Sequence, residues 1–274
     1  MMAFQAKEVF PGIWHIRDAL GVCMTLITGE KEAILADAGY GLESVKDKIR
    51  SITALPCRLI LTHGHHDHAL GAMNFEQVWI DPSESGIYRN YTAISQRRQV
   101  LSWPREPDVQ VDEAAYLEKK MPEPSYIGEC TLVLGSRHVQ VIHCPGHTPG
   151  SLMFYVHENR LLITGDNWNP CTWLFFPEAL DVLGYRANMR NILKKYPFEY
   201  VLCSHLHALF GRNTITAFFE GLTDERLAAA VPTPEGDTRN IRTGKCEPAE
   251  GQQLIFDLDK YAHAVAGGKE HAAL

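Results

Sequence analysis

The stretch LTHGHHDHALG, residues 61–71, places four histidines and one aspartate within six consecutive positions. It continues the apolar run CRLIL, which reads as a buried strand. Imidazole and carboxylate groups are the usual ligands of zinc and similar divalent ions, and dense spacing lets one loop supply several of them. His63 and His65 lie two positions apart at the strand end and point the same way, and Asp67 and His68 follow on the turn. The stretch therefore predicts a metal site at the end of a strand.

Strands and helices alternate around this stretch, which favours an α/β protein. The two halves of the chain look alike in outline, with His or Asp at strand ends. The expected elements are a hairpin at 22–29 and 32–39, a helix in 41–52, strands at 57–63 and 77–80, a helix at 82–91 that begins with Pro82, three β-rich runs between 138 and 166, and helices at 178–195 and 214–230 with a strand at 200–205 between them.

Two segments differ from this pattern. In residues 95–125, four prolines surround the short helical pattern EAAYLEKK, and we expect a surface insertion or lid there. The tail AVAGGKEHAAL, residues 264–274, is small and polar, and we expect it to be frayed. The chain has 274 residues, of which 45% are hydrophobic and 22% charged, so residues 1–274 are expected to form a single domain with an ordinary core.

Charge and composition exclude several classes of partner. The formal net charge is −7 and no block of Lys or Arg stands out, so we expect no nucleic-acid partner. No signal-peptide pattern and no membrane-spanning apolar stretch is visible, so we expect a cytoplasmic protein that acts on a small-molecule substrate; a homo-oligomer stays open. The seven cysteines are widely spread without a Cys-x-x-Cys pair, and we interpret them as reduced, mostly buried thiols.

Four segments together resemble the signature of the metallo-β-lactamase fold superfamily. THGHHDH resembles its T-H-x-H-x-D-H motif, and CPGHTPGS resembles its P-G-H-T-P-G turn, with His147 as the third histidine of the first metal site. LLITGD resembles its strand that ends in a bridging aspartate, here Asp166, and VLCSH its late strand that ends in a histidine, here His205. The matches run from about residue 25 to 205 and are specific for the fold, but not for the substrate.

The resemblance implies a four-layered αβ/βα sandwich with two divalent metal ions at the edge of the sheets. Zinc is the first expectation, with iron and manganese as alternatives. In this scheme one ion is held by His63, His65 and His147, the other by Asp67, His68 and His205, and Asp166 bridges the two.

Three further histidines compete for these roles. His66 stands at a variable position of the motif and should point away from the metal. His143 is expected to order the loop that follows its strand. His207 is the real competitor of His205, because strand alternation lets both point the same way; the motif favours His205.

Such a site predicts a hydrolase. Two divalent ions about 3.5 to 4 Å apart share a water, lower its pKa towards neutrality and polarise a carbonyl or phosphoryl oxygen. A bridging hydroxide would then attack a small ester, lactone or thioester, and Asp67 would pass the proton to the leaving group. The best-known zinc β-lactamases of this superfamily carry a cysteine at the position of Asp166, so glyoxalase II-like thioesterases and lactonases fit this sequence better.

The run DNWNPCTWLFF follows Asp166 and suggests an apolar wall for the substrate, because loops that start at a site carry specificity. The wall residues would be Trp168, Trp173, Phe175 and Phe176.

Three alternative functions stay open. A phosphodiesterase of the same fold would need cations near the metals, and Arg186, Arg190 or Arg212 could fold into the site. A mononuclear iron dioxygenase acting on glutathione persulfide shares much of the histidine signature. A metal-binding sensor module is the third, less favoured because all seven ligands are present.

Overall fold

The computed structural model describes residues 4–104 and 109–272, and these form two large sheets and a smaller third one. The first sheet consists, in hydrogen-bonded order, of β1 (Gln5–Phe10), β2 (Ile13–Arg17), β3 (Cys23–Thr28), β4 (Ala33–Ala36), β5 (Cys57–Ile60), β6 (Val78–Ile80) and β7 (Pro124–Tyr126). The second is ordered β14 (Phe210–Gly211), β13 (Tyr200–Leu202), β11 (Leu161–Ile163), β10 (Leu152–Val156), β9 (His138–His143) and β8 (Cys130–Val133). The third is ordered β12 (Cys171–Leu174), β17 (Gln252–Asp257), β16 (Thr243–Ala249) and β15 (Val231–Thr233).

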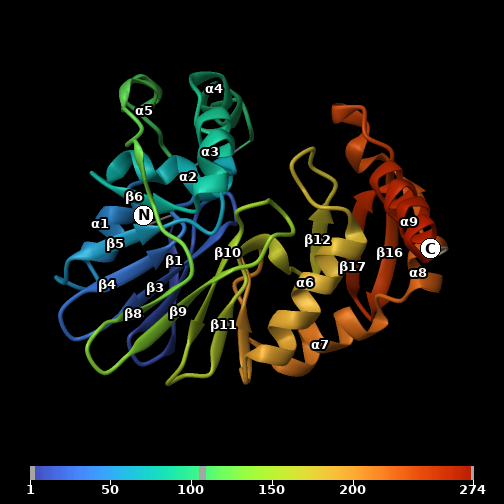
Figure 1. Cartoon of the computed structure of the whole chain (residues 1–274). Coiled ribbons are helices and arrows are strands. Elements are labelled where there is room, and N and C mark those ends of the chain that lie inside the picture. Colours follow the sequence, from blue (N-terminus) through green and yellow to red (C-terminus); the bar gives the residue numbers. More distant parts are fainter. Residues whose placement is uncertain (1–3, 105–108, 273–274) are drawn as a thin grey trace.

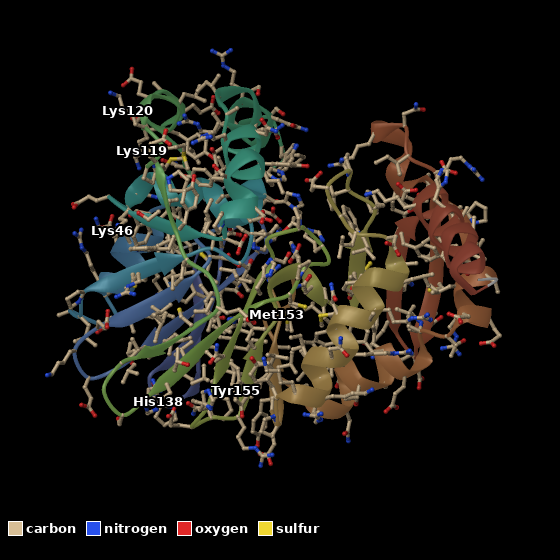
Figure 2. All side chains as sticks on the ribbon, in the orientation of Figure 1. Lys46, Lys119, Lys120, His138, Met153 and Tyr155 are labelled. Atoms are coloured by element: carbon tan, nitrogen blue, oxygen red, sulfur yellow. The ribbon has the colours of Figure 1, made fainter. Side chains whose placement is uncertain are left out.

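Strand β10 explains why the two large sheets stack, because all five of its residues are buried. Successive side chains of a strand point to opposite faces. Phe154 packs in the core between the two sheets with residues such as Ile34 and Ile60 of the first sheet. Met153 and Tyr155 pack instead with helix residues such as Met189, and Figure 2 shows Met153 in the middle of the molecule. Both faces of this sheet are therefore covered, one by a sheet and one by helices.

Helices cover the outer faces of both large sheets (Figure 1), which gives the αβ/βα sandwich that the resemblance implies. Near the first sheet lie α1 (Val45–Arg50), α2 (His66–Ala69), α3 (Ser85–Tyr91), α4 (Ile94–Leu101) and α5 (Glu113–Glu118). Near the second and third sheets lie α6 (Val182–Lys195), α7 (Arg212–Gly221), α8 (Asp224–Ala228) and α9 (Leu258–Ala272). The 3-10 turns are η1 (Leu70–Asn74), η2 (Pro82–Glu84), η3 (Gly165–Asn167) and η4 (Pro234–Arg239).

The longest helix over the second sheet, α6, follows from its sequence. Asp181 caps it, because its carboxylate accepts hydrogen bonds from the backbone N–H groups of Leu183 and Gly184, each at 3.0 Å. Its buried side chains recur at helical spacing and form one stripe facing the sheet. Burial of each large side chain stabilises the fold by about 1.5–3 kcal/mol. These buried residues are Val182, Tyr185, Met189, Ile192 and Leu193.

Most expected elements are present, with shifted ends. The hairpin is β3 and β4, the strand before the histidines is β5, and the helix at 82–91 opens as a 3-10 turn at Pro82 before α3. The pattern at 214–230 is two helices, α7 and α8, rather than one. The seven cysteines are free thiols, four of them buried, as expected.

The segment at 95–125 contains regular structure tied to its surroundings. The buried Arg97 donates hydrogen bonds to the carbonyl oxygens of Tyr116 (3.2 Å) and Lys119 (2.6 Å), which joins α4 to α5. Its last residues enter β7, the edge strand of the first sheet, and are scaffold rather than insertion. Residues 105–108 lie outside the described part of the chain.

The C-terminal segment differs from the frayed tail that composition suggested. Helix α9 continues to Ala272, directly after β17 of the third sheet, and covers most of the segment expected to be frayed. Figure 1 places this sheet and α9 beside α6. Among the described residues, no helix has both the length and the apolar character needed to cross a bilayer.

Candidate metal centre

Three histidines form a first group of ring nitrogens at the end of β5. The ring nitrogens of His63, His65 and His147 lie within 4.8 Å of one another, and all three side chains are buried. Nε2 of His63 lies 3.1 Å from Nδ1 of His65, and Nε2 of His147 lies 3.0 Å from that same atom. His65 is the N-cap of α2, and His147 lies in the loop between β9 and β10.

The outer nitrogen of each of these rings has an acceptor. His147 Nδ1 donates to the carbonyl oxygen of Trp173 at 2.8 Å, and His65 Nε2 donates to the Glu178 carboxylate at 2.6 Å. His63 Nδ1 lies 3.0 Å from the hydroxyl oxygen of Thr62, whose own proton goes to the Asp37 carboxylate at 2.9 Å. A neutral imidazole has a single N–H, so the three inward nitrogens face one another with lone pairs and no proton. This arrangement fits a bound cation.

A second group contains two carboxylates and two imidazoles. Ligand atoms of Asp67, His68, Asp166 and His205 lie within 4.8 Å of one another. Nε2 of His205 lies 3.0 Å from an Asp166 oxygen and 3.5 Å from an Asp67 oxygen. Asp166 also lies 3.7 Å from Nε2 of His147, so its carboxylate stands between the two groups.

An orphaned nitrogen marks the second group as a cation site as well. His68 Nδ1 donates to Asp37 at 2.9 Å, while its buried Nε2 has no hydrogen-bond partner and lies 3.4 Å from Asp67 and 3.5 Å from Asp166. Burial opposes the charge of His68, yet the carboxylates, Asp67 foremost, raise its pKa well above its ordinary value. The two carboxylates therefore stabilise a positive charge at this position, and a divalent ion would supply it.

In the first group the histidine pKa values shift in the opposite direction. Burial lowers the pKa of His63 well below its ordinary value, and burial lowers the pKa of His147 to about 4. Both rings stay neutral at physiological pH, as metal-ligating imidazoles must be.

Several local features hold these side chains in place. Asp37, at a positive φ of 68°, orients both Thr62 and His68. Gly165 precedes Asp166 at φ 56°, and a Cβ there would lie 2.8 Å from the Thr62 side chain, so this position requires glycine. Asp67 and His68 lie on the single-turn helix α2, not on an irregular turn as the spacing suggested.

Glu84 joins the two motif loops. Its fully buried carboxylate accepts hydrogen bonds from the backbone N–H groups of Gly64 and Gly150, both at 2.8 Å. One glycine lies in the loop of the first two histidines and the other in the loop of His147. Sequence reasoning missed Glu84 and Glu178, because their partners lie 20 and 113 residues away along the chain.

The remaining histidines lie outside both groups. His207 donates from Nε2 to the carbonyl oxygen of His15 at 2.8 Å. His143 donates to the carbonyl oxygen of Pro149 at 3.0 Å, which orders the loop as expected. The ring of His66 packs against Trp103, with centroids 5.5 Å apart.

The four aromatic residues expected as a wall have different surroundings. Phe176 packs against the first group, with its ring centroid 4.8 Å from that of His65 and 5.3 Å from that of His147. Trp173 is 42% exposed and lies beside Phe175, which is itself fully buried. Trp168 was expected as a wall residue, but it is fully buried in the core beneath the helices and cannot contact a substrate.

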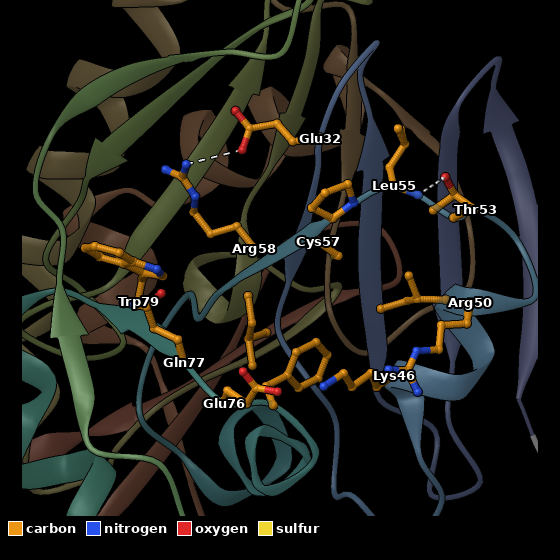
Figure 3. A pocket seen from close by; sticks show the side chains of 15 residues that line it. Glu32, Lys46, Arg50, Thr53, Leu55, Cys57, Arg58, Glu76, Gln77 and Trp79 are labelled. Atoms are coloured by element: carbon orange, nitrogen blue, oxygen red, sulfur yellow. Dashed lines mark hydrogen bonds and ion pairs between the residues drawn. The ribbon is translucent and has the colours of Figure 1, made fainter.

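The three arginines considered as phosphate ligands are engaged elsewhere. Arg186 and Arg190 donate to the Leu222 carbonyl oxygen, and Arg212 donates to that of Leu193. An arginine that sequence reasoning did not single out, Arg239 of η4, lies 4.8 Å over the Phe176 ring. A hollow of about 690 Å³ on another face contains the Arg58–Glu32 ion pair of 3.2 Å and none of the predicted ligands (Figure 3).

Comparison with known proteins identifies the family of this chain. The family profile described as the metallo-beta-lactamase superfamily matches residues 17–205, more than half of the chain. The chain belongs to this superfamily.

Two curated proteins are similar to this chain in sequence. The chain is 27% identical over 203 residues to the acyl-coenzyme A thioesterase MBLAC2 of Gallus gallus, covering 68% of this chain and 72% of that protein. It is 25% identical over 150 residues to the hydroxyacylglutathione hydrolase GloC of Haemophilus influenzae, covering 53% of this chain and 65% of that protein.

Solved structures show the same fold. A metallo-beta-lactamase from Pontibacter korlensis aligns with TM-score 0.54 and 17% identity, over 78% of this chain and 95% of that one. The sec-alkylsulfatase Pisa1 from Pseudomonas sp. aligns with TM-score 0.61 and 17% identity, over 82% of this chain and 43% of that one. At this identity the likeness concerns the metallo-beta-lactamase fold alone.

Proposed function

We propose that this protein is a binuclear metal-dependent hydrolase that cleaves acyl thioesters, with small esters and lactones as substrates of the same chemistry. The observation that carries the proposal is the convergence of imidazole nitrogens and carboxylates in two adjoining groups. These two groups contain the same seven residues that the sequence analysis proposed as ligands. One ion would be held by His63, His65 and His147, the other by Asp67, His68 and His205, with Asp166 between them.

Two divalent ions, zinc being the first choice for this ligand set, would supply Lewis acidity for a carbonyl oxygen and ionise a water near neutral pH. The chain itself supplies orientation. Glu178, Thr62 and Asp37 hold the rings of His65, His63 and His68 through their outer nitrogens, so that the inward nitrogens of these rings face the positions that the ions would take.

Asp67 is the candidate for proton transfer. Its carboxylate is mostly buried, and burial alone would raise its pKa, but His68 and other nearby imidazoles hold that pKa well below the ordinary value. It is therefore ionised and can accept a hydrogen bond from an attacking water, but it is a weak base, so proton transfer to it would require the metal ions to lower the pKa of that water. A thiol leaves as a thiolate near neutral pH, so little acid assistance to the leaving group is needed.

The surroundings of the metal groups suit an apolar acyl group. Phe176 packs against two of the ligand rings, and Tyr91 of helix α3 lies 4.5 Å from the His65 ring. Trp103 adds a third aromatic surface next to His66. Two relatives are named as an acyl-coenzyme A thioesterase and a hydroxyacylglutathione hydrolase, and both names describe thioester cleavage, which favours thioesters over the other carboxylic esters.

The test is a panel of thioesters, esters, lactones and phosphodiesters on protein loaded with zinc, manganese or iron. We expect thioester hydrolysis that chelation abolishes, with two metal ions per chain. Hydrolysis of phosphodiesters alone would overturn the proposal, as would oxygen consumption with a persulfide substrate at one iron per chain. A fully metallated protein inert to the whole panel would favour a sensor.

Asp166→Ala probes the binuclear arrangement. It removes the carboxylate that stands between the groups, so we expect loss of one ion and a fall in kcat/KM of at least about 100-fold, since even outer-shell changes cost about 10–100-fold. Asp224→Ala removes an exposed carboxylate paired with Arg186 and is the control. Two ions bound at full strength in Asp166→Ala would contradict the assignment.

A further inference from the structure

Strands β15, β16 and β17 of the third sheet and helix α9 lie outside the residues that match the family profile, yet they support the segment beside the metal centre. Strand β17 pairs in parallel with β12, whose Trp173 accepts the hydrogen bond of His147 Nδ1. Lys260 of α9 donates to the carbonyl oxygens of Phe176 at 3.0 Å and Ala179 at 2.6 Å. The C-terminal part of the chain therefore holds the segment that carries Phe176 and Glu178.

The same part of the chain places a cation beside the centre. The guanidinium of Arg239 lies 4.8 Å over the Phe176 ring, and the same ring contacts the rings of His65 and His147. Arg239 therefore contacts an aromatic side chain that packs against two candidate ligands of the first metal group. A guanidinium stacked on an aromatic face keeps its N–H groups free to bind other groups.

The Arg239 side chain is exposed, and among the side chains that the structure describes no carboxylate forms an ion pair with it. Arg242, three residues further on, is paired with Asp259 at 2.7 Å. An exposed guanidinium without such a pair can bind an anionic group of a ligand.

We propose that Arg239 binds an anionic group, a carboxylate or a phosphate, on the thiol portion of the substrate and thereby selects anionic thioesters. This rests on the proposed thioester hydrolysis. The apolar surfaces of Phe176, Tyr91 and Trp103 suit the acyl portion, which leaves the charged end of the substrate for Arg239. A guanidinium binds carboxylate and phosphate oxygens through paired N–H groups.

The test uses two butyryl thioesters that differ in charge alone, one of 3-mercaptopropionate and one of 3-mercaptopropionamide. We expect Arg239→Gln to lower kcat/KM for the anionic thioester by about 10-fold or more, mainly through KM, and to change the neutral one by less than about 2-fold. Arg239→Lys should restore part of the loss. Arg242→Gln, the matched control, should leave both substrates unchanged.

A binding experiment separates failure of this inference from failure of the proposed function. Calorimetry measures binding of the S-butyl thioether of 3-mercaptopropionate and of its neutral amide to the metal-loaded protein. Weaker binding of the anionic thioether alone in Arg239→Gln supports the inference even if no thioester is hydrolysed. Equal effects on both ligands and both substrates, or no effect, would overturn it, whereas hydrolysis insensitive to Arg239 would leave the hydrolase proposal standing.

Discussion

At the scale of single residues, protonation decides what each histidine does. The ligands of the first group have their outer nitrogens bound to acceptors, so the inner nitrogens are lone pairs. His207 has the opposite role, because it donates to a backbone carbonyl oxygen away from the metal groups. His205 and His207 are separated by one residue, yet the first is a candidate metal ligand and the second donates a structural hydrogen bond.

This difference predicts distinct outcomes for His205→Ala and His207→Ala. We expect the first to lose one bound ion, because Nε2 of His205 contributes to the second group. The second should keep both ions and lose about 1 kcal/mol of unfolding free energy with the hydrogen bond to His15. Metal analysis and denaturant unfolding measure both; loss of an ion in His207→Ala alone would exchange the two roles.

His15 predicts a pH dependence of stability. Burial lowers its pKa from the ordinary 6.5 to about 4. Between these pH values His15 is protonated in the unfolded chain but neutral in the folded chain. The contribution of His15 to stability is therefore fully present above about pH 6.5 and is lost towards pH 4. The loss is on the order of 3 kcal/mol.

Unfolding of the metal-free protein at several pH values tests this. His15→Gln should flatten the loss of stability between pH 6.5 and 4, whereas His138→Gln, at an exposed imidazole, should not. An identical slope in wild type and His15→Gln would mean that other groups account for the acid sensitivity.

At the scale of elements, the segment between the metal motifs brings Trp103 against a histidine of the first motif. Trp103 follows α4 and packs 5.6 Å from the Tyr40 ring and 5.5 Å from the His66 ring. We expect Trp103→Ala to raise KM for a butyryl thioester by up to about 10-fold, the loss of one buried apolar contact, with unchanged metal content. Ile94→Ala, at an exposed residue of helix α4, is the control. Loss of metal in Trp103→Ala would show that the segment supports the metal scaffold itself.

The sequence predicted the elements that carry the ligands because their signals are local. Hairpin β3–β4, strand β5 and the four motif segments each depend on residues that are close along the chain. The third sheet was missed, because β16 contains Gly244 and Pro248 and shows no clean alternation. Arg239 and Lys260 were missed for the same reason, since their positions depend on that sheet.

At the scale of the whole molecule, the third sheet shares the core of the second. Phe256 and Leu254 of β17 are fully buried in the same cluster as Tyr185 and Met189 of α6. We therefore expect the metal-free protein to unfold in a single transition, with fluorescence and circular dichroism coinciding. The single domain expected from length and composition stays a prediction, which this experiment tests.

Phe256→Ala should lower the unfolding free energy by about 3–5 kcal/mol without splitting that transition. Val231→Ala, an exposed residue of the same sheet, should change it by less than about 0.5 kcal/mol. Two separate transitions in either variant would mean that the third sheet is an independent folding unit.

The pairing of β12 with β17 also has a consequence for synthesis of the chain. The ribosome makes β12 some eighty residues before the strand that completes its sheet, at about 5–20 residues per second. All seven candidate ligands have been synthesised by residue 205, but the lysine that holds the wall segment is residue 260. All seven candidate ligands are thus synthesised several seconds before Lys260, so the order of synthesis allows ion capture before the segment with Phe176 is held in place.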